Sequence, residues 1–317
     1  MNKVLITGGT GLIGASIEKI VPKDQLNNYL FLSSKECDLT SFEETTKLFE
    51  KEKPTHVIHL AACVGGLFKN LNYKVEMLEK NLLINFNVLK ACFNFNVKKC
   101  ISCLSTCVFP DDVTYPINEN MLHMGAPHDS NYGYAYAKRM LEIHSRVYQE
   151  QFNKDFICII PTNIYGWNDN YHLEDAHVIP ALIHKCYLAK KNKEMFIVKG
   201  TGKPLRQFIY SDDLAKLILF TLKDYNDKTS IILSTGEEDE ISIKDVATII
   251  AKEFSYENYL TFDISFSDGQ YKKTADNTKI KKLYQEKTGE GFKFTTIEDG
   301  LKETIRYFIN NYNLCRK

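Results

Sequence analysis

The sequence has no excess charge of either sign. Forty lysines and arginines are matched by forty aspartates and glutamates, so no net field attracts nucleic acid or an anionic membrane. No run approaches the roughly 18 consecutive apolar residues that cross a bilayer. We therefore expect neither a nucleic-acid partner nor membrane insertion, and any phosphate ligand must be held by a local site.

The nine cysteines are odd in number and lack the paired C-x-x-C spacings of zinc sites. Nothing at the beginning of the sequence resembles a signal peptide. Together these features predict free thiols, no metal site and a cytoplasmic location. Hydrophobic residues make up 44% of the chain and charged residues 25%, which is typical of a folded globular protein.

Short apolar runs alternate with helix-length amphipathic stretches in the first half of the chain. Such alternation predicts βαβ units around a parallel sheet. The fold class that follows is α/β: a Rossmann-like, doubly wound parallel sheet with a smaller, mixed α/β C-terminal substrate domain. The apolar runs lie at 3–7, 29–32, 56–61, 100–104 and 156–160, and helical patterns at 12–20, 81–95 and 134–152.

The amino-acid composition changes after Pro161, where predicted loops rich in Asn, His and Asp begin. We assign residues 1–165 to a dinucleotide-binding domain, with 206–228 returning to it, and 166–317 mainly to the substrate domain. Ser211 is predicted to cap a helix at the end of a strand. The C-terminal part is expected to contain helices at 178–190 and 242–254 and a strand at 196–199.

A glycine-rich turn joins the first predicted strand to the first helix. Gly8, Gly9, Gly11 and Gly14 have the spacing that lets a backbone approach a pyrophosphate at a helix N-terminus. Such a motif is weak evidence alone, but the strand before it and the helix after it are the context that supports it. A purely structural turn is the alternative. We expect a nicotinamide dinucleotide here.

The end of the second predicted strand indicates which dinucleotide is used. An acidic residue there would bind the ribose hydroxyls and repel a 2′-phosphate. The chain instead reads Ser33-Ser34-Lys35 after Leu32. Hydroxyls and a cation favour NADP, unless these residues form only a solvated turn.

Tyr134 and Lys138 are four residues apart and therefore share one helix face, where the ammonium is expected to lower the pKa of the phenol. A pair of this kind is often only a surface feature. Ser105, however, directly follows the fourth apolar run, at the sheet edge where ligands bind. We expect the three residues to handle protons at a carbonyl or alcohol carbon, as in short-chain dehydrogenases and reductases.

Several segments together resemble the GDP-L-fucose synthases of the extended short-chain dehydrogenase/reductase superfamily, which are 3,5-epimerase-4-reductases of GDP-4-keto-6-deoxy-D-mannose. Ser105-Thr106-Cys107 and the segment that begins at His177 are the most specific of them. The resemblance runs in order along nearly the whole chain, at 60–66, 104–110, 161–166, 177–180, 206–210 and 267–273.

The resemblance implies two reactions at one site: inversion at carbons 3 and 5 of the keto sugar, then reduction of carbon 4 by NADPH. It assigns Cys107 as the base, provided that its pKa is depressed, and His177 as the acid on the opposite face. Tyr134 would donate the proton during reduction, Lys138 would tune it and bind the cofactor ribose, and Ser105 would hydrogen-bond the carbonyl. Without the resemblance, a cysteine after a parallel strand is more often a core residue.

The same resemblance implies the binding residues and a homodimer formed through the helices at 81–95 and 134–152. One position departs from the family pattern, since Lys199 stands where a tryptophan is common. Cofactor contacts are expected from Gly8, Gly9, Thr10, Gly11, Leu12, Ile13, Gly14, Ser34, Lys35, Asp38, Leu39, Lys138, Pro161, Thr162, Asn163, Ile164 and His177. Substrate contacts are expected from Ser105, Asn163, Lys185, Lys199, Arg206 and Asp268.

Three alternatives compete with this interpretation. A 4,6-dehydratase would carry an acidic pair near residues 105–107, where this chain has Cys107. A nucleotide-sugar 4-epimerase would need no Cys107 and His177 pair. It would also consume no reduced cofactor, whereas a reductase of another nucleotide sugar would consume it. A non-catalytic cofactor sensor often loses the tyrosine or the lysine, and both are present here.

Overall fold

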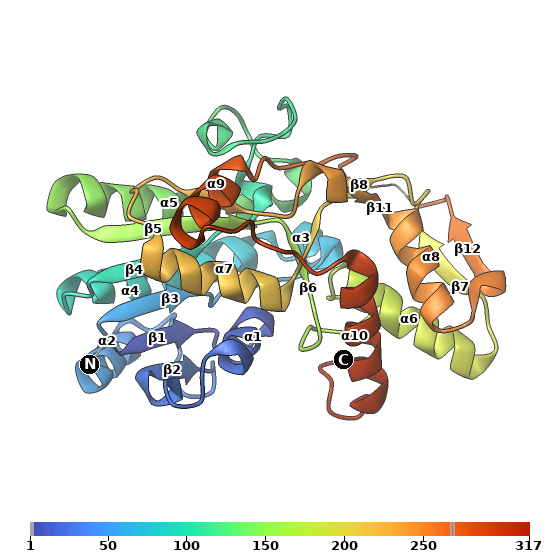
Figure 1. Cartoon of the computed structure of the whole chain (residues 1–317), viewed down its shortest axis with the longest axis horizontal. Helices are drawn as coiled ribbons and strands as arrows, with labels where there is room; N and C mark the ends of the chain where they lie inside the picture. Colours follow the sequence, from blue (N-terminus) through green and yellow to red (C-terminus); the bar gives the residue numbers. More distant parts are fainter. Residues whose placement is uncertain (1–2, 267, 269) are drawn as a thin grey trace.

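A six-stranded parallel sheet organises the N-terminal part of the computed structural model, which describes residues 3–266, 268 and 270–317. The strand order is β10-β5-β4-β3-β1-β2 (Figure 1). After β2 the chain crosses to the other side of β1, so the switch point where such sheets bind ligands lies between β1 and β3. The strands are β1 (Val4–Thr7), β2 (Tyr29–Leu32), β3 (His56–His59), β4 (Lys99–Cys103), β5 (Asp155–Pro161) and β10 (Ile231–Leu233).

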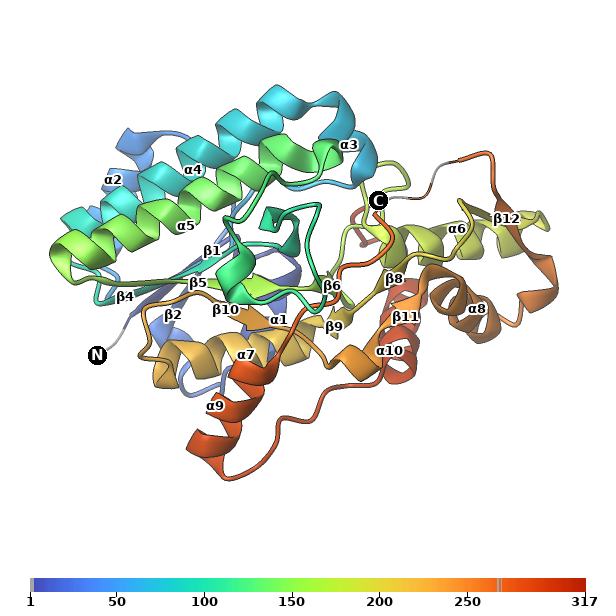
Figure 2. The same ribbon diagram turned by 90° about the horizontal axis from the view of Figure 1, so that it is seen from above.

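Helices cover both faces of this sheet, which confirms the doubly wound α/β fold. One face is packed by α2, α4 and α5, and the other by α1 and α7, with α9 against β10 (Figures 1 and 2). Each face has its own buried apolar cluster. The helices are α1 (Leu12–Ile20), α2 (Phe42–Glu52), α3 (Leu67–Asn72), α4 (Lys74–Asn94), α5 (Tyr132–Phe152), α7 (Ser211–Asp224) and α9 (Thr278–Thr288).

The segment that returns to the sheet is longer than the predicted 206–228. Ile231 pairs with Ile159, so β10 adds a sixth strand beyond residue 228. Helix α9 lies farther along the chain again and packs on that strand. Part of the region assigned to the substrate domain therefore covers the sheet of the first domain.

The remaining elements form a second lobe with a third apolar cluster. Its strands pair two by two: β7 with β12 in parallel, and β8 with β11 antiparallel. Strands β6 and β9 also pair, and they connect the two lobes (Figure 1). These elements are β6 (Asn163–Tyr165), α6 (Val178–Asn192), β7 (Phe196–Lys199), β8 (Leu205–Arg206), β9 (Phe208–Tyr210), β11 (Ile241–Ser242), α8 (Ile243–Glu253), β12 (Leu260–Asp263) and α10 (Ile297–Asn310).

Of the two helix caps predicted from the sequence, one is confirmed and the other is wrong. The Ser242 side chain accepts a hydrogen bond from the Asp245 amide and caps α8 as predicted. Ser211 does not cap α7, because the N-cap residue is Tyr210. Its buried hydroxyl instead accepts a hydrogen bond from the Ser16 hydroxyl at 2.8 Å. That bond ties α7 to α1, beside the glycine-rich turn.

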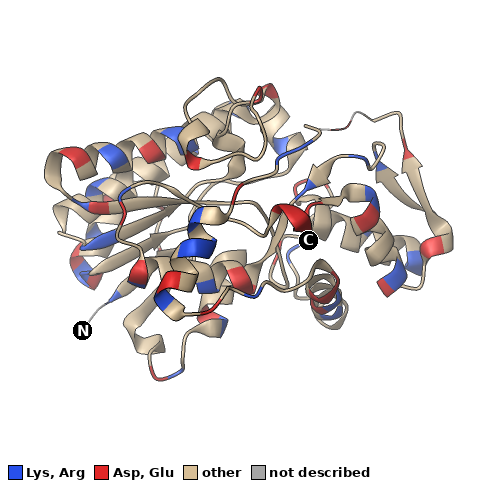
Figure 3. Ribbon diagram, turned by 45° about the horizontal axis from the view of Figure 1, so that its top comes forward, with Lys and Arg blue, Asp and Glu red and all other residues tan. Residues whose placement is uncertain are grey.

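The surface agrees with the balanced composition. Basic and acidic residues are interspersed along the helices in view in Figure 3. Within the described ranges, no helix has the length and hydrophobicity needed to cross a membrane.

Candidate active site

The turn between β1 and α1 is built so that side chains would not fit. Gly8 has a φ of +68°, in the region that favours glycine. A Cβ on Gly9 would come within 2.6 Å of the Phe31 Cα, and a Cβ on Gly14 within 2.2 Å of the Gly9 oxygen. The glycines therefore let the turn, the second strand and the helix pack together, with the N-terminus of α1 facing the adjoining cavity.

That cavity has a volume of about 560 Å³ and runs along the carboxyl edge of the sheet. Among the predicted cofactor residues it is lined at one end by the turn and by Ser34, Asp38 and Leu39, and at the other by Lys138, residues 161–164 and His177. The Thr162 hydroxyl is buried with no hydrogen-bond partner among the described residues. The exposed backbone of the glycine turn and the unpaired Thr162 hydroxyl fit a dinucleotide, because such a ligand carries hydrogen-bond donors and acceptors of its own.

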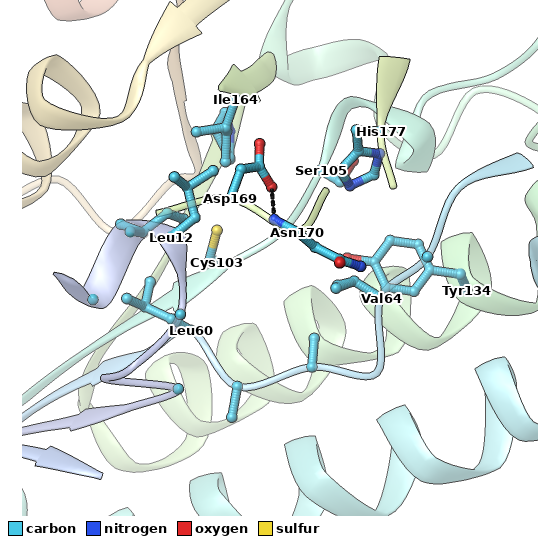
Figure 4. A pocket seen from close by; sticks show the side chains of 18 of the residues that line it. Leu12, Leu60, Val64, Cys103, Ser105, Tyr134, Ile164, Asp169, Asn170 and His177 are labelled. Carbon is cyan, nitrogen blue, oxygen red and sulfur yellow. Dashed lines mark hydrogen bonds between the residues drawn. The ribbon is translucent and has the colours of Figure 1, made fainter. Parts of the chain in front are cut away.

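The predicted proton-handling residues project into the same cavity. Tyr134, Ser105 and His177 all line it (Figure 4). Lys138 is 1% exposed, and its Nζ donates a hydrogen bond to the Cys103 carbonyl at 2.7 Å. That Nζ lies 5.8 Å from the centre of the Tyr134 ring. The geometry brings together residues that are up to 72 positions apart in the chain, from Ser105 to His177.

The expected depression of the Tyr134 pKa is not found. Burial raises the pKa of this phenol well above its usual value, and the nearby cysteines Cys107, Cys103 and Cys63 act in the same direction. Burial also lowers the pKa of Lys138. Desolvation by burial is the largest cause of both shifts. Tyr134 therefore stays protonated at neutral pH, which suits a proton donor.

Cys107 is buried in the short turn that follows β4. Its amide donates a hydrogen bond to the Ser105 hydroxyl at 3.4 Å, and its side chain belongs to a buried apolar cluster. Unlike Ser105, Cys107 is not among the described residues that line the cavity. The sequence required a depressed thiol pKa, but burial raises the pKa of Cys107. The Ser105 hydrogen bond and the charges of Lys273 and Lys138 oppose that rise. The thiolate form is therefore scarce at neutral pH.

His177 is the N-cap residue of α6 and lines the cavity. The side chain reaches solvent, yet the surrounding protein disfavours its charged form and lowers its pKa. The imidazolium of His177 therefore gives up its proton more readily than a free histidine does.

Comparisons with known proteins agree with this geometry. Residues 4–234 match the model of the NAD dependent epimerase/dehydratase family. A GDP-L-fucose synthase of Dictyostelium discoideum is 56% identical over 99% of this chain and 97% of that protein. A probable GDP-L-fucose synthase of Drosophila melanogaster is 44% identical over the full length of both. The chain belongs to the GDP-L-fucose synthase family.

A solved member of the family has the same fold. The crystal structure of a GDP-L-fucose synthetase from Naegleria fowleri bound to NADP superimposes with a TM-score of 0.92 at 46% identity, covering 100% of this chain and 96% of that one.

Beside the end of β2, the predicted cofactor residues differ in whether they line the cavity. Ser34 and Asp38 line it, whereas Lys35 is solvent-exposed and is not among the lining residues of the described chain. The sequence indicated no role for Glu36. Its carboxylate accepts hydrogen bonds from the Ser33 amide and hydroxyl at 2.8 and 2.7 Å, which fixes the shape of the turn.

The predicted substrate residues of the second lobe lie outside the cavity lining. Arg206 donates hydrogen bonds to the Leu205 and Gln270 carbonyls at 2.7 and 2.6 Å. Asp268 accepts bonds from the amide and hydroxyl of Thr201. Ser267 and Gly269, from the segment that resembles the family, lie outside the described residues.

Lys199, the departure from the family pattern, is exposed, and its Nζ lies 4.4 Å from the centre of the Phe266 ring. Burial and the charge of Lys199 lower the pKa of Lys185, so these two cations lie near each other. Lys273 received no separate role from the sequence, although its charge acts on Cys107. Only the fold brings these two residues together.

Proposed function

We propose that this chain converts GDP-4-keto-6-deoxy-D-mannose to GDP-L-fucose by 3,5-epimerisation followed by NADPH-dependent reduction at carbon 4. The observation that carries the proposal is the shared cavity: the glycine turn, Ser105, Tyr134 and His177 all line it. The named relatives support the choice of substrate, since they are GDP-L-fucose synthases.

The first half of the reaction depends on the ketone at carbon 4. Removing the proton from carbon 3 or carbon 5 moves charge onto the carbonyl oxygen and gives an enolate. In our proposal the hydroxyls of Ser105 and Tyr134 donate hydrogen bonds to that oxygen. The raised pKa of Tyr134 is consistent with this role, because the phenol keeps its proton while the enolate forms.

Inversion requires that a proton leaves one face of the sugar and another arrives on the opposite face. We assign removal to the thiolate of Cys107, which becomes a thiol as the C–H bond breaks. His177 then delivers a proton to the carbanion carbon, and solvent restores both groups. The positive charge of Lys273 favours the thiolate, and the lowered pKa of His177 favours proton release.

In the second half, carbon 4 is reduced. Bound NADPH supplies the hydride. Tyr134 gives its phenolic proton to the oxygen at carbon 4 as the carbonyl becomes an alcohol. Lys138, held by the Cys103 carbonyl, stabilises the resulting phenolate and fixes the side of the cavity where the ribose of the cofactor would lie.

The test of this proposal is incubation of the purified protein with the keto sugar and NADPH in deuterated water. NADPH oxidation with deuterium at carbons 3 and 5 of GDP-fucose is expected. Reduction without deuterium would leave a plain ketoreductase. Deuterium exchange without NADPH oxidation would leave an epimerase, and no turnover would redirect the search to another nucleotide sugar.

We expect that the replacement Ser34→Asp changes the cofactor preference. Ser34 is exposed to the cavity just after β2, and a carboxylate there would repel the 2′-phosphate of NADPH. NADPH affinity should fall roughly 10- to 100-fold. NADH serves as the internal control, measured by the same fluorescence titration, and its affinity should hold or rise. An equal loss for both cofactors would contradict the assignment.

We also propose that the chain forms a homodimer and works in the cytoplasm, where its nine free thiols would stay reduced. Helices α4 and α5 lie side by side on one face of the molecule (Figure 2). Their outer surfaces expose the large apolar side chains of Leu83, Phe86, Met140 and Val147, each at least 45% exposed. Two copies that pair these helices would bury that surface.

The replacement Phe86→Asp is expected to weaken self-association at least tenfold, because it places a charge in the apolar surface of α4. Sedimentation velocity over a range of protein concentrations measures the effect. The matched control is Ile264→Asp, which changes an apolar side chain in the second lobe that is more exposed than Phe86, at 76% against 52%. A wild-type protein that sediments as a monomer at all concentrations would contradict the dimer.

A further inference from the structure

A loop of the second lobe and the segment 311–317 lie together against the glycine turn. Asn168 donates hydrogen bonds from its side chain to the Thr10 and Gly11 carbonyls at 3.3 and 3.4 Å. The guanidinium of Arg316 donates to the Asn168 carbonyl. The Tyr171 amide donates to the Arg316 carbonyl at 2.7 Å. This chain of contacts places Arg316 beside the N-terminus of α1.

The charge of the cavity makes this placement informative. A dinucleotide pyrophosphate carries two negative charges, and the glycine turn offers it only backbone N–H groups. Among the described residues that line the cavity, the lysines and arginines are Lys138 and Arg316. Lys138 is engaged with Cys103, at the end where Tyr134 lies. Arg316 is the cation of the lining that stands next to the turn.

Asp169 supplies an independent sign of a ligand at the same place. The residue is 6% exposed and lines the cavity (Figure 4). One carboxyl oxygen accepts a hydrogen bond from the Asn170 amide at 2.7 Å. The other is buried with no partner among the described residues. A buried oxygen without a partner is costly, so a ligand atom is expected to satisfy it.

The protonation of Asp169 decides which kind of atom it can contact. Burial raises the pKa of this carboxyl group to about 7, against the smaller effects of the Asn170 amide and the charge of Arg316. Near neutral pH a substantial fraction is therefore the neutral acid, which has an O–H to donate. An anion in the cavity would raise this fraction further, because it disfavours a second negative charge nearby.

We propose that Arg316 binds the pyrophosphate of the dinucleotide cofactor from the side of the 168–170 loop, with the Asp169 carboxyl group as a hydrogen-bond donor to the same group. The inference rests on the proposed use of such a cofactor by this chain. It adds a charged contact from the segment 311–317 to a site that the sequence had assigned to the glycine turn and the strand ends. Asn168 holds the guanidinium in place before the cofactor arrives.

The experiment measures the binding of NADPH and of NADH to the full chain without substrate, by cofactor fluorescence and by calorimetry. Arg316→Ala should weaken both cofactors by a similar factor, about tenfold or more, because a charge-assisted hydrogen bond is lost. The loss should shrink as salt rises. The matched control, Lys317→Ala, removes the neighbouring cation, whose Nζ lies over the Tyr312 ring, and should bind both cofactors normally.

Each other result has a separate meaning. A loss for NADPH alone would overturn the pyrophosphate assignment in favour of the 2′-phosphate, and unchanged binding of both would overturn the contact altogether. Arg316→Lys should regain part of the affinity. If it binds as weakly as Arg316→Ala while both variants melt well below the wild type, the segment acts through folding and the proposal fails. A wild-type chain that binds neither cofactor would instead overturn the proposed function.

The role of Asp169 is tested by two replacements in the same assay. Asp169→Asn keeps an N–H donor and should hold NADPH affinity within about threefold, whereas Asp169→Ala removes the donor and should lower it roughly tenfold. If the two variants bind NADPH equally weakly, with unchanged melting temperatures, the carboxyl group does not act as a donor and this part of the proposal is wrong.

Discussion

Replacing Cys107 with serine is expected to reduce deuterium incorporation at carbons 3 and 5 by about 10²- to 10⁴-fold, the usual range for a lost general base. A hydroxyl in place of the thiol has nearly the same size but is a far weaker acid, so almost no anion forms. NADPH binding should be unchanged. The measurement is mass spectrometry of the sugar after incubation in deuterated water, with cofactor binding followed by fluorescence.

The dependence on pH provides a second readout for Cys107. Burial raises the pKa of its thiol, with Ser105 and Lys273 acting in the opposite direction. Below that pKa, each unit of added pH increases the thiolate fraction about tenfold. Above the lowered pKa of His177 its imidazolium fraction falls by the same factor, so the rate of exchange should climb at acidic pH, below both pKa values, and level off between them. The serine variant should lose this slope. Cys158→Ser, at a buried cysteine on β5, is the control and should keep both the rate and the slope.

Full exchange in Cys107→Ser would show that another group removes the proton. Such a result would leave Cys107 as a core residue of the turn after β4, which its membership of the apolar cluster also permits. It would leave the roles of Tyr134 and Lys138 in reduction unaffected, because these concern a different bond.

The sequence predicted the central sheet well because each of its long strands is a nearly continuous apolar run. The run at 29–32 coincides with β2, and the run at 100–104 is shifted by one residue from β4. Strand β10 escaped prediction, since Ile231–Leu233 is three residues long and offers no periodicity to distinguish it. The start of α4 at Lys74 was also missed by seven residues. The exposed Val75 in its first turn, at 67%, lies off the apolar face that marks the helix.

The candidate site was likewise predicted only in part. The glycine turn, Ser105 and the residues after β5 follow strand ends, and parallel strands bring their carboxyl ends to one edge. Local sequence could therefore indicate them. The contact between Asn168 and Arg316 joins residues 148 positions apart, and no spacing rule predicts such a pairing. The predicted direction of the Tyr134 pKa shift was wrong, and the depressed pKa that the role of Cys107 required is not found. Burial dominates both shifts, and it is a property of the folded chain.

The replacement Tyr134→Phe should separate the two halves of the reaction. Without its hydroxyl, the residue cannot give a proton to the oxygen at carbon 4, and NADPH oxidation is expected to fall about 10²- to 10⁴-fold. Deuterium exchange at carbons 3 and 5 should fall much less, since the Ser105 hydroxyl can still hydrogen-bond the enolate oxygen. Stopped-flow absorbance of NADPH and mass spectrometry of the sugar measure the two rates on the same sample.

A matched control for this variant lies two residues away. Tyr136 is on the same helix but is 42% exposed, so Tyr136→Phe should change neither rate. If Tyr134→Phe lowers exchange and reduction by the same factor, the phenol contributes equally to both steps and Ser105 alone does not hold the enolate. If it lowers neither, the proton for the alcohol comes from elsewhere. His177, which also lines the cavity, would then be the residue to replace next.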